Sequence, residues 1–158
     1  MSSIPRTIPL QQITNEAVGG KAEGLSRLIS LGLNVPPGFV IQHALPGQMP
    51  ADLSKHYHGI GGGAVAVRSS AIGEDSADAS FAGQYETILN VEGDDELVKA
   101  IEHCLHSIQS VHAAAYKNDK KSGEAVEMAV VVQEMVPATV AGVLFTADPV
   151  TNSRQQIV

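Results

Sequence analysis

The chain has 158 residues, which is enough for one domain with its own hydrophobic core. Ten basic and seventeen acidic residues give a formal net charge of −7, which argues against general binding to nucleic acids or to anionic membranes, because both need a basic face. A local cationic pocket for one small anion remains compatible with this balance.

The cysteine count and the hydropathy pattern indicate a cytoplasmic protein. Cys104 is the only cysteine, so no internal disulfide can form, and a reducing compartment is expected. No apolar run approaches the roughly 18–20 residues of a membrane span. The first residues lack the charged-then-apolar build of a signal peptide.

The first half of the chain predicts one helix, one strand and a connector. Apolar residues at helical spacing indicate a helix that begins near Lys21, after two glycines, and ends at Gly32. Two prolines and a glycine then turn the chain into a short strand, Phe39–Ile41. Residues 43–63 are rich in Pro, Gly and His and show no period, which predicts a connector with a brief helix near 51–57.

The second half predicts strands around one long helix. The helix begins after Gly93, carries acids in its first turn and runs to about Tyr116. One face of it is apolar, with Leu97, Ile101, Leu105, Ile108 and Val111. Strands are predicted at 65–68, 87–91, 128–135 and 140–146. The expected fold class is therefore α+β, with a mixed or antiparallel sheet and two main helices.

The segment between the strands at 65–68 and 87–91 has features that are typical of a phosphate-binding site. A strand that ends on Arg68 and opens into a loop of small residues can hold a polyphosphate, because the guanidinium makes paired bonds to phosphate oxygens. A surface loop with a solvated arginine is the alternative. Lys21, next to two glycines at a helix start, can reach a phosphate too, or it is a solvated lysine on an amphipathic helix.

Three blocks of sequence resemble one family. Val18–Ile41 reads VGGKAEGLSRLISLGLNVPPGFVI, residues 66–91 read AVRSSAIGEDSADASFAGQYETILNV, and residues 130–151 read VVVQEMVPATVAGVLFTADPVT. They are similar to the N-terminal ATP-binding domain of phosphoenolpyruvate synthase, pyruvate phosphate dikinase and rifampicin phosphotransferase. The resemblance covers essentially the whole chain, so residues 1–158 are expected to be the N-terminal part of such a domain.

The resemblance implies an ATP-grasp fold, in which ATP lies between two α+β lobes, and this chain would be the first lobe. It implies that Lys21 and Arg68 hold ATP phosphates and that Gly83 and Thr87 make loop and strand contacts to the nucleotide. Gln133 would lie on the adenine side. For these last three positions, residue type alone leaves a purely structural role open. Gly83 could be a turn glycine, Thr87 a β-branched strand residue, and Gln133 an ordinary strand end.

The family transfers phosphate from ATP through a phosphohistidine on another domain to pyruvate or a similar acceptor. The resemblance therefore implies that the second lobe, the phosphohistidine domain and the Mg²⁺ ligands lie outside this chain, which is expected to be truncated after Val158 and inactive alone. No catalytic residue and no metal ligand is predicted within it. Glu74, Asp75 and Asp78 are expected to point to solvent, and the six histidines are not spaced as a zinc site.

Two rival interpretations remain open at this stage. The chain could be a stand-alone nucleotide-binding or regulatory module without catalysis, or an α+β domain that binds no nucleotide. The acceptor and the oligomeric state cannot be predicted, although the strand that begins at Arg154 and stops at Val158 would leave an edge open to pairing with another copy.

Overall fold

The computed structural model describes residues 4–14, 17–71, 86–118, 128–145, 147–148, 151 and 153–154. Its strands are β1 (Arg6–Pro9), β2 (Gly38–Gln42), β3 (Val65–Ala71), β4 (Thr87–Val91) and β5 (Met128–Glu134), and its helices are α1 (Gly19–Ser30), α2 (Leu53–Gly59) and α3 (Asp94–Asn118). The strands form one sheet in the order β1-β2-β5-β3-β4, with every neighbouring pair antiparallel. The predicted α+β class, with an antiparallel sheet and two main helices, is confirmed.

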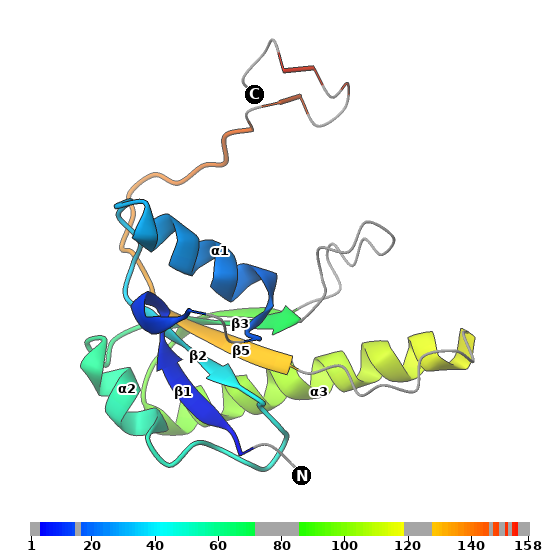
Figure 1. Ribbon diagram of the computed structural model, residues 1–158. Helices are drawn as coiled ribbons and strands as arrows, with labels where there is room; N and C mark the ends of the chain where they lie inside the picture. The colour runs from blue at the N-terminus through cyan, green and yellow to red at the C-terminus, as the bar shows by residue number, and fades with distance from the viewer. Residues whose placement is uncertain are drawn as a thin grey trace.

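The sheet lies between two layers of helix. Figure 1 shows α1 above the sheet and α2 and α3 below it. Each face carries its own apolar cluster, and the larger one joins buried residues of β2, β3 and β5 to Tyr57, Leu97 and Ile101 on the α2–α3 side. The smaller one joins Val18 and Ala22 of α1 to the opposite face of the sheet. The central strand β5 is buried on both faces, which explains its continuous run of valines.

The end of α1 and the start of α3 lie where the sequence predicts them, whereas α1 begins at Gly19, so the two glycines that were predicted to precede it belong to its first turn. Gly32 has φ +76°, its N–H donates to the carbonyl of Ile29, and the N–H of Leu33 donates to that of Leu28, which together form a Schellman motif after α1. Acidic residues occupy the first turn of α3. Among the described helices, none is long and apolar enough to cross a membrane.

Tyr57 of α2 connects the connector region to the start of α3. Its ring is 1% exposed, and its hydroxyl accepts a hydrogen bond of 2.8 Å from the N–H of Gly93. The same hydroxyl can donate to the carbonyl of Gly62 at 2.8 Å or of Gly63 at 3.0 Å. The segment that we predicted as a connector therefore supplies a buried residue of the larger core.

The structure corrects the sequence prediction at three places. Strand β1 was missed, because RTIP is short and lies between two prolines, and it forms an edge where proline is tolerated. The strand that we predicted at 140–146 is wrong for residues 140–145, which are exposed and have no sheet partner to satisfy an extended backbone. Arg68 does not end its strand, since β3 stays paired with β5 as far as Ala71.

Strand β4 forms the other edge and carries a bulge. Val91 pairs with Val65 and Ile88 with Val67, so Leu89 and Asn90 together stand opposite the single residue Ala66. Asn90 adopts φ +57°, a left-handed conformation that asparagine tolerates better than most residues. The bulge lets both Ile88 and Val91 pack toward α3 while Leu89 stays 54% exposed.

Candidate functional site

Three of the predicted site residues lie on one face of the sheet. Arg68 pairs with Thr87 on one side and with Val131 on the other, and directly opposed residues in an antiparallel pair share a face. Gln133 follows Val131 by two positions and therefore shares that face as well. Val131 belongs to the cluster beneath α1, so this is the face that α1, with Lys21 in its first turn, covers. We call it the α1 face.

Arg68 has an unsatisfied donor on this face. Its Nε is buried and has no hydrogen-bond partner, and it is the one such side-chain atom found in the described part of the chain. A buried guanidinium nitrogen without an acceptor costs free energy, so native proteins rarely leave one unpaired without a functional reason. An anionic oxygen would supply the missing acceptor, and phosphate suits the planar guanidinium fork.

The first turn of α1 is attached to β3 close to Arg68. Ser70, two residues further along β3, is 0% exposed. Its hydroxyl donates to the carbonyl of Val18 at 2.9 Å and accepts from the N–H of Ala22 at 3.4 Å. Lys21 immediately precedes Ala22, so the lysine and the arginine are carried by two elements that are hydrogen-bonded together. Sequence reasoning missed Ser70, although a serine inside an apolar strand is a visible signal.

The start of α1 is suited to an anion. Gly19, which is buried, has φ +79° and Gly20 follows, so the backbone can turn tightly and neither residue adds a side chain of its own. The positive end of the helix dipole lies here, and no acidic residue is present in the first turn. This start differs from that of α3, whose first turn holds three acids.

Gln133 is less available than the sequence prediction assumed. Its side chain is 9% exposed, and its Nε2 donates to the carbonyl of Pro36 at 3.1 Å. The backbone N–H groups of Glu134 and Met135 also have partners, the carbonyls of Pro37 and Ala64. The side-chain carbonyl of Gln133 is thus the group left to meet an adenine edge, and that role stays a prediction.

The structure describes Thr87 but not Gly83. Thr87 is exposed on the edge strand β4, directly opposite Arg68, so its hydroxyl can reach a ligand bound over that arginine. Gly83 lies outside the described residues, as do Glu74, Asp75 and Asp78. Their predicted roles remain predictions.

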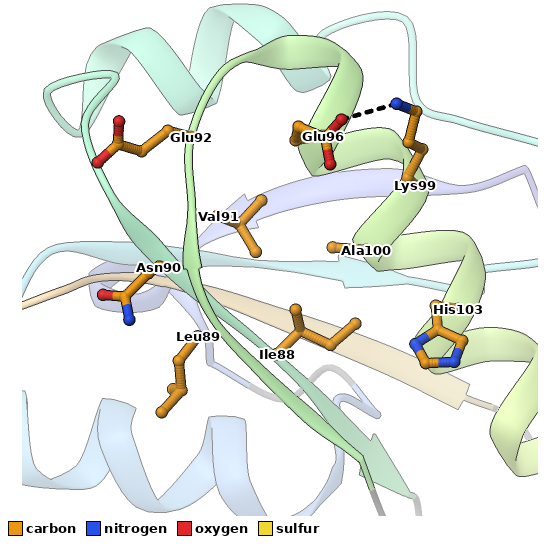
Figure 2. Close-up of a pocket in the computed structure, with 9 residues that line it drawn as sticks. All are labelled: Ile88, Leu89, Asn90, Val91, Glu92, Glu96, Lys99, Ala100 and His103. Atoms are coloured by element: carbon orange, nitrogen blue, oxygen red, sulfur yellow. Dashed lines mark hydrogen bonds and ion pairs between the residues drawn. The ribbon is translucent and has the colours of Figure 1, made fainter.

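A groove of about 570 Å³ lies on the other side of the sheet, between β4 and α3. Figure 2 shows its lining residues, with Glu96 and Lys99 joined by an ion pair of 2.7 Å. None of the four predicted site residues that the structure describes (Lys21, Arg68, Thr87 and Gln133) lines it. Glu92 and Glu96 would repel a phosphate, and the ammonium of Lys99 is already paired, so this groove does not suit a nucleotide.

The residues that the structure describes give little support for a metal site or for a reactive nucleophile. No three residues among their His, Cys, Asp and Glu gather as a metal site. His58 instead contacts Asp94 at 3.0 Å, and His106 contacts Glu102 at 3.8 Å. Cys104 is 0% exposed and lies in the larger core, as predicted.

Cys104 should be inert in the folded chain. Burial, together with the negative charge of Glu86, raises the pKa of this thiol to about 12. We expect iodoacetamide to label it only after unfolding in urea. The unfolded thiol ionises near pH 9 whereas the folded one stays protonated, so the free energy of unfolding should fall as the pH rises from about 9 to 12. Urea titrations at pH 8 and pH 10 measure this loss of stability. If a Cys104→Ala variant lost as much stability between these two pH values as the parent does, the loss would not come from this thiol.

The fold and the α1 face define a class of protein. The α+β lobe bonds the glycine-rich start of α1 to the strand that carries Arg68, whose Nε is buried and unpaired, and such features are typical of anion-binding domains. Residues 42–158 match the family described as "Pyruvate phosphate dikinase, AMP/ATP-binding domain", and the chain belongs to this family. The match includes Arg68, Thr87 and Gln133 and begins after Lys21.

Curated relatives place the chain in the same family. It is 39% identical to the prodigiosin synthesizing transferase PigC of Serratia marcescens and 33% identical to the phosphoenolpyruvate synthase of Aeropyrum pernix, over 89% of this chain in both cases. It is 46% identical to a rifampicin phosphotransferase of a Streptomyces species over 58% of this chain. The expected family and the α+β ATP-binding lobe are therefore confirmed.

The chain covers a small part of these relatives. It spans 19% of the Serratia protein, 24% of the Aeropyrum protein and 11% of the Streptomyces protein. The alignments with the first two extend over 173 and 194 positions, more than the 158 residues present here. Both relatives therefore carry additional residues inside the matched region.

Proposed function

We propose that the α1 face binds the phosphates of ATP. Lys21 and Arg68 would hold phosphate oxygens, with the first N–H groups of α1 between them. Thr87 and Gly83 would contact the nucleotide from the β4 side, and Gln133 would face the adenine. The observation that carries the proposal is the buried, unpaired Nε of Arg68 on the face covered by the glycine-rich start of α1.

In this proposal the residues of the chain bind and orient the nucleotide. The guanidinium and the ammonium offset the phosphate charge, and the sheet beneath them fixes the direction from which the triphosphate approaches. Mg²⁺, when bound, would offset the charge of the phosphates, and its protein ligands are proposed to lie outside this chain. No catalytic residue is proposed within residues 1–158.

For the whole protein, we infer an ATP-dependent phosphotransferase. The names of the Aeropyrum and Streptomyces relatives support this class, and the name of the Serratia relative is that of a transferase. Phosphate would pass from ATP through a histidine on another domain to pyruvate or a similar acceptor. A cytoplasmic location is part of this proposal, since the one thiol is buried and reduced.

A titration with Mg-ATP, AMP and GTP, followed by chemical shifts, tests nucleotide binding. We expect an ATP-selective response with a Kd in about the millimolar range, because one lobe supplies few charge-assisted bonds. Lys21→Ala should weaken it about tenfold or more. Lys99→Ala is the matched control, since Lys99 lies on the α3 side and is paired with Glu96. Equal effects of the two variants would contradict the proposed site.

A further inference from the structure

Ser70 occupies an unusual position between a strand and a helix. In α1 the N–H of Ala22 and the carbonyl of Val18 are four residues apart, the spacing of a first helical hydrogen bond. The Ser70 hydroxyl contacts both groups, donating to the carbonyl at 2.9 Å and accepting from the N–H at 3.4 Å. The hydroxyl of a strand residue therefore bridges the first turn of this helix.

The first turn of α1 needs such a constraint. Its N-cap residue, Val18, makes no side-chain capping bond. Gly19 and Gly20 then give this turn more conformational freedom than any other residue pair would allow. The turn that carries Lys21 also packs through Val18 and Ala22, both 0% exposed, and the bridge adds a directional bond to this packing.

Ser70 also links this turn to the arginine. It lies two positions after Arg68 on β3, so both side chains project from the α1 face. We propose that Ser70 is a positioning residue that holds the first turn of α1, and with it Lys21, over the face of Arg68. The position of the Lys21 ammonium relative to Arg68 then depends on one buried hydroxyl. This inference rests on the proposed function of the α1 face.

The adjacent Ser69 provides a matched control. It is also 0% exposed, and its hydroxyl also donates to a backbone carbonyl, that of Glu86 at 3.4 Å. Because neighbouring strand residues point to opposite faces, Ser69 faces the α3 side. Ser69→Ala and Ser70→Ala thus remove the same atom from the same strand at equal burial, on opposite faces of the sheet.

The experiment compares affinities for ATP and adenosine across Ser70→Ala, Ser69→Ala and Lys21→Ala. Ser70→Ala should weaken ATP binding roughly five- to tenfold, the effect of one net hydrogen bond, and leave adenosine binding unchanged. Ser69→Ala should leave both unchanged. In the Lys21→Ala background Ser70→Ala should add little, since its effect passes through the lysine. Amide exchange at Ala22 should rise in Ser70→Ala and not in Ser69→Ala.

Each alternative outcome has a defined meaning. If Lys21→Ala weakens ATP binding while Ser70→Ala acts like Ser69→Ala, the positioning role is overturned and the phosphate site stands. If Lys21→Ala has no effect, the phosphate site itself fails. Additive effects of Ser70→Ala and Lys21→Ala would show that Ser70 acts independently of Lys21 and would overturn the positioning role. Should Ser70→Ala fail to fold, Ser70→Cys keeps the side-chain shape with a somewhat larger atom, weakens the hydrogen bonds and is read by the same criteria.

Discussion

Replacing Arg68 by methionine should make the fold more stable and abolish its response to ATP. The buried Nε of Arg68 has no acceptor, and an unpaired buried donor costs about 1–3 kcal/mol. Methionine keeps much of the side-chain length and removes the polar atom. We therefore expect the free energy of unfolding to rise by about 1 kcal/mol, while ATP affinity falls by about tenfold or more through the loss of charge-assisted bonds.

Urea unfolding and an ATP titration of the same samples measure the two opposite effects. Arg27→Met is the control, because Arg27 is an exposed arginine in the last turn of α1, away from its glycine-rich start. It should change neither stability nor affinity. A loss of stability in Arg68→Met would mean that the guanidinium has a structural role, which would remove the main support for a phosphate at this position.

The largest loss of stability is expected at Tyr57. Tyr57→Ala removes a fully buried ring from the larger core and should cost about 3–5 kcal/mol. Tyr57→Phe keeps the ring but leaves the N–H of Gly93 and the carbonyls of Gly62 and Gly63 without their partner. It should cost about 0.5–1.5 kcal/mol, the usual net contribution of a hydrogen bond, because Gly63 and Gly93 are exposed and water can reach their backbone groups.

Urea unfolding separates the ring from the hydroxyl, and amide exchange locates the effect. In Tyr57→Phe the amide of Gly93 should exchange faster, because it precedes α3 and loses its acceptor. The amide of Ala22, on the opposite face of the sheet, should be unchanged. A Tyr57→Phe variant as stable as the parent would show that water replaces the hydroxyl without cost.

Local pattern was sufficient to predict most of the elements. The bounds predicted for β4 are those observed, and Gly32 ends α1 through the left-handed conformation that glycine favours. The local pattern failed where the presence of a neighbouring strand decides whether a segment becomes a strand. RTIP becomes a strand only because β2 lies beside it, and residues 140–145 are apolar and β-prone yet have no neighbouring strand.

The candidate site was predictable in part, for a related reason. Arg68 and Lys21 were predicted because their residue types and small neighbouring residues carry a chemical signal, and their roles stay predictions. Their arrangement was not predictable, since it depends on the bond from Ser70 to Val18, which joins residues 52 positions apart. The bond from Gln133 to Pro36 spans 97 positions and limits a role that the local sequence left open.

The bulge in β4 also affects how this molecule behaves at high concentration. An edge strand with evenly spaced N–H and C=O groups is a template on which a second chain can add. Leu89 and Asn90 interrupt that spacing and increase the local twist, so an incoming strand would lose register partway along β4. We therefore expect Asn90 to make this outer strand, which exposes an apolar leucine, a poorer template for pairing with another chain.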